Sequence, residues 1–457
     1  MERQKISVIF PYFMKGLSKS EQRWFAIMRI ITRCVIYDER MKGKSGGGYI
    51  MSDKICSSAD KVLEVFLENA PMDTSHHRMV KQQNKCGYGL QGVCCRLCSN
   101  GPCRLSPAKP KGVCGADADT IACRNFLRQV AAGSGCYTHV VENTARRLKE
   151  MAQELQAEGK KPKYKDSVAK LAKILQINCC GNCGPDCHNS CAKTAEMIAD
   201  AVLADIRKPY DEKMTLMKHI ALPKRYEVWE KLGILPGGAK DEIFNAVVKT
   251  STNLNSDPMD MLLQCLRLGI STGNYGLILT NLMNDIIMGP PQISMDPVGF
   301  RIIDPEYINI MITGHQQSMF ADLEEKLESE IVQKSAELVG AKGIRIVGCT
   351  CVGQDYQARS VCYKDVYCGH AGNNYTSEAV LMTGCVDLVV SEFNCTIPGI
   401  EPICEQLDIK MLCLDDVAKK ANAELLPYTA EEKEKITSQI IADALCGFKN
   451  RKEKLYG

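Results

Sequence analysis

The spacing of apolar residues changes along the chain, and the change predicts two kinds of structure. Between residues 51 and 250, apolar side chains recur at helical spacing, most clearly in ENTARRLKEMAQEL (142–155) and TAEMIADAVLADI (194–206). From about residue 300, short apolar runs alternate with helix-like stretches such as the one at 320–340. The runs are YINIMIT (307–313), IRIVG (344–348), VDLVVSEF (386–393) and KMLCL (410–414). This alternation predicts a parallel sheet with crossover helices.

The same patterns divide the chain into three expected parts. Residues 1–50 are interpreted as a leader or extension that adds little to a core. We expect residues 51–250 to form a helical domain and residues 251–457 a Rossmann-like α/β domain. The predicted fold class is therefore multi-domain, α and α/β.

The composition argues against several classes of function and does not by itself indicate one. The 457 residues are 45% hydrophobic and 24% charged, which is ordinary for a globular protein. A net charge of +3 does not favour nucleic acid as a partner. No apolar run approaches the roughly 18 residues of a membrane span, and the N-terminus does not read as a signal peptide. No G-x-G-x-x-G motif follows a strand-like run, so a dinucleotide cofactor is not expected.

The 25 cysteines are the exceptional feature of the composition. Without an export signal they do not indicate a disulfide scaffold, since cytoplasmic thiols are kept reduced. Cysteines at short spacings then indicate bound metal. Isolated ones such as Cys34, Cys265, Cys413 and Cys446 are expected to be small buried apolar groups.

The densest group of cysteines lies at residues 86–114, CGYGLQGVCCRLCSNGPCRLSPAKPKGVC. Cys95, Cys98, Cys103 and Cys114 form the spacing C-x2-C-x4-C-x10-C, which suits four thiolates around a [4Fe–4S] cluster. Zinc is the weaker interpretation because zinc sites usually show two separated C-x2-C pairs. Cys86 and Cys94 remain, and two thiolates do not complete a cluster. They are either inert or meet a second pair from another subunit across a two-fold axis.

A second constellation follows the predicted strands. Metal-competent side chains come directly after three of the runs: His315, Cys351 and Cys395. Sites in open α/β sheets form beyond the carboxyl ends of the strands, so these three are expected to converge. Cys362, Cys368 and His370, in the next loop, are candidates to join them.

A third group reads CCGNCGPDCHNSC at residues 179–191. Its spacings can surround an iron–sulfur cluster or a zinc ion, and the alternative is a cysteine-rich insertion between helices. The candidate ligands are Cys179, Cys180, Cys183, Cys187 and Cys191, with His188 among them.

These segments, taken in order, resemble the anaerobic nickel–iron carbon monoxide dehydrogenases. The resemblance rests on the 86–114 motif with the following GVCGADADTIACRNFLRQVAAG, and on YEVWEKLGILPGG, INIMITGHQQ, IRIVGCTCVGQD and LMTGCVDLVVSEFNCTIP. It covers roughly residues 55–420. The hybrid-cluster proteins, which are hydroxylamine reductases, share the fold, but the C-x7-CC-x2-C pattern is typical of the dehydrogenases.

The resemblance implies a role for each cysteine group. Cys95, Cys98, Cys103 and Cys114 would hold a [4Fe–4S] cluster within each subunit, and Cys86 and Cys94 would supply half the ligands of a cluster shared across a homodimer. His315, Cys351 and Cys395 would be ligands of a catalytic nickel–iron–sulfur cluster. The implied reaction is CO + H2O to CO2, two protons and two electrons, which pass to a ferredoxin in the cytoplasm.

The sequence also departs from the family pattern. The family has a final α/β domain, with the remaining cysteine ligands and a lysine, that this sequence does not contain. Thr313 stands where the family has a histidine, and Thr350 where it often has a second cysteine. Of the family's line of histidines after the first motif, only His139 is present. These departures leave open two alternatives: an iron–sulfur electron-transfer subunit without turnover, and a hydroxylamine-reductase-like enzyme.

Overall fold

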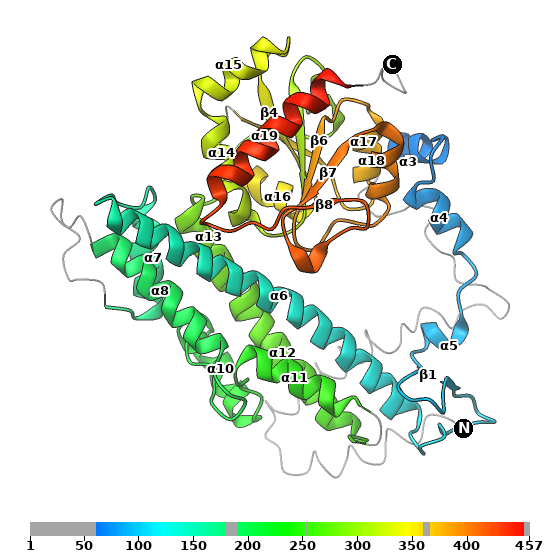
Figure 1. The fold of residues 1–457 in the computed structure, drawn as a ribbon. Coiled ribbons are helices and arrows are strands. Elements are labelled where there is room, and N and C mark those ends of the chain that lie inside the picture. Colours follow the sequence, from blue (N-terminus) through cyan, green and yellow to red (C-terminus); the bar gives the residue numbers. More distant parts are fainter. Residues whose placement is uncertain (1–60, 179–189, 252–253, 360–365, 452–457) are drawn as a thin grey trace.

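A computed structural model describes four stretches of the chain, residues 61–178, 190–251, 254–359 and 366–451. They form a helical part and a part built on a parallel sheet, in agreement with the predicted fold class (Figure 1).

One helix organises the helical part. Helix α6 (Ala118–Ala157) has 40 residues, about 60 Å at the usual rise of about 1.5 Å per residue, and Asp117 caps it by accepting from the Thr120 N–H at 2.9 Å. The main elements that pack against α6 in the described part of the chain are α8 (Ser190–Ile206), α11 (Ala239–Lys249), α12 (Pro258–Ser271), the π-helix η2 (Thr272–Leu279) and α13 (Thr280–Ile287). Shorter helices complete this part: α7 (Lys165–Leu175), α9 (Met217–Ile220) and α10 (Pro223–Lys231). The helices expected at 142–155 and 194–206 lie within α6 and α8.

The sheet part has six strands in the order β5-β4-β3-β6-β7-β8, and every neighbouring pair is parallel. The strands are β3 (Ile308–Thr313), β4 (Ile344–Cys349), β5 (Tyr367–Gly372), β6 (Leu388–Ser391), β7 (Lys410–Cys413) and β8 (Glu424–Leu425). The four predicted runs correspond to β3, β4, β6 and β7. The helices between and after them are α14 (Ala321–Leu327), α15 (Glu330–Leu338), α16 (Thr350–Ala358), α17 (Ser377–Met382), α18 (Ile400–Leu407) and α19 (Lys433–Lys449).

Alternate residues of the strands fill two separate cores. Ile310 and Ile312 of β3 pack with α14 and α19 on one face, whereas Met311 packs with α17 and α18 on the other. A sheet covered on both faces explains why its central strands are continuous apolar runs rather than alternating ones.

The strand order of the sheet indicates where a binding site would lie. From β3 the chain moves to one side of the sheet, through β4 and β5, and then returns to place β6 on the other side of β3. This reversal between β3 and β6 is the topological switch point of a doubly wound sheet, where a crevice opens beyond the carboxyl ends of the strands.

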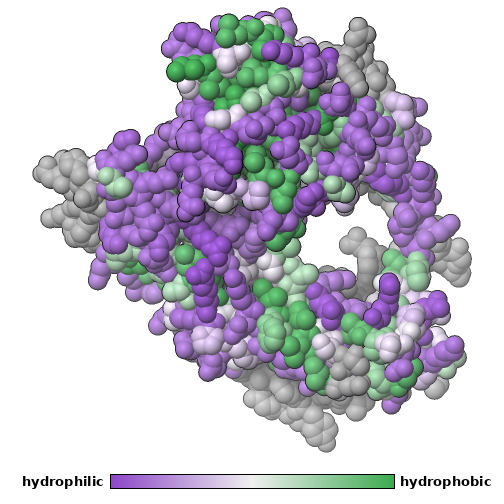
Figure 2. Space-filling model, in the orientation of Figure 1, coloured by the Kyte–Doolittle hydropathy of each residue, from purple (hydrophilic) through white to green (hydrophobic). Residues whose placement is uncertain are grey.

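The first described residues connect the two parts. Helix α3 (Lys61–Glu68) contributes Leu67 to the core of the sheet part, and α4 (Ser75–Lys81) follows it. The chain then runs to α5 (Gly87–Leu90) and the small hairpin β1 (Cys94–Cys95) and β2 (Cys103–Arg104), close to the start of α6 (Figure 1). Figure 2 shows an open space between the two parts beside this connection.

The expected domain limits stay a prediction. The described helical core includes residues as far along the chain as Ile286, and the first strand of the large sheet begins at Ile308. None of the helices in the described stretches is both long and apolar enough to cross a membrane.

Of the four isolated cysteines, Cys34 lies outside the described residues, and the other three follow the expectation with one exception. Cys265 and Cys413 are buried among apolar side chains, as predicted. The prediction for Cys446 is wrong, because this residue is exposed. It lies on the outer side of α19, whose inner face is formed by Ile440 and Ala444.

Candidate metal centre

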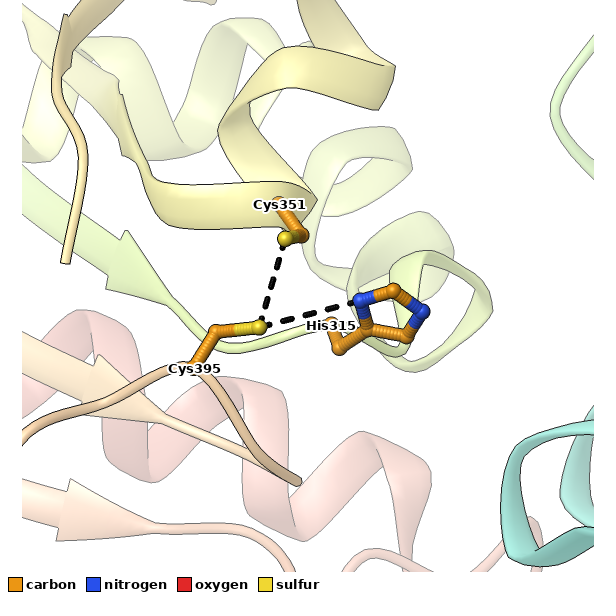
Figure 3. Close-up of side chains that lie close together, drawn as sticks. All are labelled: His315, Cys351 and Cys395. Atoms are coloured by element: carbon orange, nitrogen blue, oxygen red, sulfur yellow. Dashed lines mark hydrogen bonds between the residues drawn. The ribbon is translucent and has the colours of Figure 1, made fainter. Parts of the chain in front are cut away.

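The three predicted ligands of the second constellation meet at the switch point (Figure 3). His315 follows β3, Cys351 lies in the first turn of α16 after β4, and Cys395 follows β6. One ligand atom from each lies within 4.8 Å of the other two. The Sγ of Cys395 is 3.2 Å from the Sγ of Cys351 and 3.8 Å from the Nδ1 of His315.

The backbone at these positions is unusual. Thr350, directly before Cys351, has φ 59°, and Asn394 and Cys395 have φ 64° and 50°. Side chains with a Cβ rarely adopt this left-handed conformation, and each such residue costs on the order of 1–2 kcal/mol. Strain of this kind persists where the surrounding structure enforces it, typically at functional sites. Here it sets the direction of two candidate ligands.

A glycine and a glutamate position the loop that carries His315. Gly314 has φ 139°, and a Cβ there would lie 1.9 Å from the Oε1 of Glu392. The same Oε1 accepts the N–H of Gln316 at 2.7 Å. Glu392 is fully buried, and burial raises the pKa of its carboxyl group well above the ordinary value. The buried carboxyl group of Glu392 therefore supports the loop that carries His315 through the hydrogen bond that it accepts from Gln316.

The two thiols share a proton. The S–H of Cys395 donates to Cys351, and this bond together with His315 lowers the pKa of Cys351 to about 5. The same bond, together with burial, raises the pKa of Cys395. Of the two thiols, Cys351 is thus the one that ionises more readily. One imidazole and two sulfurs are the donors preferred by zinc, nickel and iron.

Tyr137 of α6, in the helical part, packs against the candidate ligand His315. Its ring packs edge-to-face on His315, with centroids 5.2 Å apart and an interplanar angle of 88°. Burial raises the pKa of its hydroxyl group. Gly276 permits this close approach, since a Cβ there would lie 2.5 Å from the Cβ of Tyr137. Sequence reasoning missed Tyr137, because nothing in the helical pattern of α6 distinguishes it.

The candidates in the following loop do not join the three ligands. Cys368 on β5 donates to the carbonyl of Ile346 at 3.0 Å, and burial raises its pKa to about 11. His370 is absent from the group of converging ligand atoms within the described part of the chain. Cys362 lies outside the described residues.

The first constellation lies at the start of α6. Strand pairing places Cys95 opposite Cys103, and Cys98 is in the connecting loop. A Cβ on Gly112 would lie 3.5 Å from the Sγ of Cys103, which brings the loop before Cys114 against this hairpin. In the described residues, no three of these four sulfurs lie within 4.8 Å of one another.

Two of the cysteines around this hairpin are exposed. The N–H groups of Gly89 and Tyr88 lower the pKa of Cys86, and the N–H of Ala116 lowers that of Cys114. Both thiols are therefore inclined to ionise, as metal ligands must.

The third constellation, at residues 179–191, lies mostly outside the described residues. Cys179, Cys180, Cys183, Cys187 and His188 lie outside the described residues. Cys191 is described, and it is buried in the first turn of α8.

Comparison with known proteins identifies the family. A model of the Prismane/CO dehydrogenase family matches residues 93–456. The chain belongs to the Prismane/CO dehydrogenase family. Two members are the carbon monoxide dehydrogenases of Methanopyrus kandleri, 44% identical over 88% of this chain, and of Methanocaldococcus jannaschii, 42% identical over 87%. The chain spans 61% and 63% of the lengths of these two relatives.

Solved structures of the family have the same fold. A nickel-free carbon monoxide dehydrogenase from Thermococcus sp. AM4 superimposes with a TM-score of 0.77 at 29% identity, over 85% of this chain and 60% of the other. Carbon monoxide dehydrogenase IV from Carboxydothermus hydrogenoformans gives 0.76 at 28% identity, over 86% and 60%. The recognition made from the motifs is therefore confirmed.

Proposed function

We propose that this protein takes part in carbon monoxide oxidation, CO + H2O to CO2, two protons and two electrons. The observation that carries the proposal is the convergence of His315, Cys351 and Cys395 at the switch point, in a chain that belongs to this family. Water and CO would be the substrates, and a ferredoxin-type protein would accept the electrons.

The donor set fits a nickel–iron–sulfur cluster. Soft sulfur and imidazole ligands suit nickel and iron, and the lowered pKa of Cys351 favours the thiolate form that metal ligation requires. When bound, such a cluster supplies a Lewis-acidic site for CO and water and receives the two electrons. His315, Cys351 and Cys395 would hold part of it, while Tyr137 and Glu392 keep the His315 loop in place. Burial and then the charges of Cys351 and Cys395 raise the pKa of the Tyr137 hydroxyl group, which would be a hydrogen-bond donor beside the centre.

The hairpin at the start of α6 would carry electrons away. We propose a [4Fe–4S] cluster on Cys95, Cys98, Cys103 and Cys114, and a second cluster shared by Cys86 and Cys94 of two subunits in a homodimer. The lowered pKa values of Cys86 and Cys114 support ligation there. A further cluster or zinc ion on the cysteines at 179–191 stays a proposal. A cytoplasmic location fits a chain with this many cysteines, because reduced thiols persist there.

Carbon-monoxide-dependent reduction of a viologen dye tests the activity. The protein is produced anaerobically with nickel and iron, and its metal content is measured first. We expect activity in the wild type and at least a hundredfold loss in Cys351→Ser and His315→Ala. Well-loaded wild-type protein without activity would refute the proposed reaction.

A second candidate function is an iron–sulfur electron-transfer subunit. It is favoured by the lowered pKa values of Cys86 and Cys114, which support iron–sulfur ligation near the hairpin independently of the nickel–iron site. Metal analysis separates the two: iron without nickel, in protein that still exchanges electrons with ferredoxin, supports the subunit, and nickel near one per chain supports the dehydrogenase. Reduction of hydroxylamine without nickel would instead indicate a hybrid-cluster enzyme.

A further inference from the structure

Each of the three loops that carry a candidate ligand also carries a buried threonine. Thr313 ends β3 two residues before His315, Thr350 precedes Cys351, and Thr396 follows Cys395. The Oγ1 of Thr313 lies 3.3 Å from that of Thr350 and 3.1 Å from that of Thr396. We name these three residues the threonine network. Its hydroxyl groups join three segments that are distant in sequence.

The directions of the hydrogen bonds follow from counting protons. Thr350 donates its one hydroxyl proton to the carbonyl of Gly314 at 2.9 Å and accepts the N–H of Gly314 at 2.8 Å. Thr350 has no second proton, so Thr313 must donate to Thr350. Thr313 has then used its own proton and must accept from Thr396. The hydroxyl groups therefore donate in one direction, from Thr396 to Thr313 to Thr350. The last of them donates to the carbonyl of Gly314, the residue before His315.

The hydrogen bonds of Thr350 stabilise an unfavourable backbone conformation at this residue. A β-branched residue at a φ of 59° is rare, and Thr350 adopts it with its hydroxyl clasping both polar groups of Gly314. The N–H of Val352 also donates to the Gly314 carbonyl, at 3.1 Å. The first turn of α16, which holds Cys351, is thus tied to the loop that holds His315.

We infer that the threonine network consists of positioning residues that hold His315, Cys351 and Cys395 in a metal-binding arrangement before the metal arrives; this inference rests on the proposed function only in taking these three residues as metal ligands. None of the threonines is expected to touch the metal. Their hydroxyl groups set the spacing of the loops, and a methyl group in place of a hydroxyl removes the tie while it preserves the volume.

Cobalt(II) is a suitable probe because it binds sulfur and imidazole donors and absorbs visible light. The full chain is prepared anaerobically with its iron–sulfur clusters and titrated with cobalt. The absorption that the wild type shows and His315→Ala lacks defines the site. We expect Thr350→Val to weaken cobalt binding at this site by about tenfold or more, since a buried N–H loses its acceptor. Thr350→Ser, which keeps the hydroxyl, should restore the affinity to within about twofold.

A matched control uses a threonine elsewhere. Thr437 in α19 is equally buried and its hydroxyl donates to the carbonyl of Lys433 at 2.7 Å, so Thr437→Val removes a buried hydroxyl without touching the three loops. It should leave cobalt binding unchanged. Where Thr350→Val does not fold, Thr396→Val serves instead: it breaks the Thr396–Thr313 bond and should weaken binding about threefold to fivefold, with rescue by Thr396→Ser.

Two results would overturn the inference. One is equal cobalt affinity in the wild type and the valine variants, and the other is a wild type that shows no His315-dependent cobalt signal. Because no CO is present in the titration, inactive protein with the expected cobalt affinities would refute the proposed reaction and leave the network intact.

Discussion

At the scale of single residues, the centre is held by backbone conformations that few side chains accept. Gly314, Thr350, Asn394 and Cys395 all have positive φ values. The hydrogen bond that Glu392 accepts from Gln316 and the hydrogen bonds of the threonine network offset this strain. The positions of the candidate ligands therefore depend on the conformation of these loops, and small changes in the loops should alter both stability and metal binding.

Gly314→Ala tests this directly. The new Cβ would collide with the buried Glu392, so the free energy of unfolding should fall by about 3–4 kcal/mol. Gly340→Ala is the matched control: its φ is also positive, at 87°, but no atom lies within 4 Å of the new Cβ, and the loss should be about 1–2 kcal/mol. Anaerobic denaturant unfolding measures both. Equal losses would mean that Glu392 moves aside freely.

The ligands could be predicted from the sequence, but their supporting residues could not. His315, Cys351 and Cys395 each follow a strong apolar run, and parallel strands end at one edge. Tyr137 comes from a helix far away in the chain, and only packing brings it to His315. Thr313 and Thr350 stand out in the sequence only as departures from the family pattern, because the hydrogen bond between them depends on the three-dimensional arrangement of β3 and α16.

At the scale of elements, the long helix α6 is bound to α8 by polar groups as well as by its core. Glu196 on α8 accepts from Gln153 and Gln156 of α6 and from Lys193, at 2.7–3.1 Å. These hydrogen bonds, that from Lys193 first, lower the pKa of Glu196 to about 2. The ionised carboxylate is therefore part of the contact between the two helices.

Glu196→Gln should reveal this contribution through its pH dependence. The pKa is lower in the folded state than the ordinary 4.5, so the stabilisation is present above pH 4.5 and is lost as the pH falls toward 2. At pH 7 the variant should be less stable by about 1–2 kcal/mol, a value reduced for the partly exposed Lys193. Thermal melts from pH 7 to 3 should show the difference shrinking.

Glu150 on α6 provides a control of opposite sign. Burial raises its pKa, so its ionisation opposes folding as the pH rises above the ordinary value. Glu150→Gln should leave stability at pH 7 unchanged or increased. A pH-independent deficit in Glu196→Gln, or a loss in Glu150→Gln, would contradict the assignment of these two carboxylates.

The elements themselves were predictable where the apolar pattern was strong. β3, β4, β6 and β7 are buried runs of Ile, Val, Leu and Met. β5 reads YCGHAG and β8 has two residues, so neither carries such a run, and pairing at the sheet edges defines them instead. The single helix expected at 320–340 is two helices, α14 and α15, separated at Ser329.

At the scale of the whole molecule, the two cysteine sites stand far apart on one rigid element. The hairpin contacts the start of α6, and Tyr137 marks the centre, nineteen residues after Ala118. At about 1.5 Å per residue, the separation along the axis is roughly 28 Å. Sites this far apart with no shared partner should respond to mutation independently.

Cys98→Ser tests this independence and the cluster assignment together. Loss of one ligand should lower the iron content by about four atoms per chain, because a [4Fe–4S] cluster needs four thiolates. In Cys98→Ser, the affinity for cobalt at the His315-dependent site should stay within about twofold of the wild type. Cys351→Ser should have the opposite effect, with normal iron at the hairpin and no cobalt absorption. Iron analysis with electron paramagnetic resonance of the reduced protein measures the first site, and the cobalt titration the second. If Cys98→Ser also abolished cobalt binding, the two sites would not be independent. The structure of the metal centre would then depend on the hairpin, through the helix α6 that connects them.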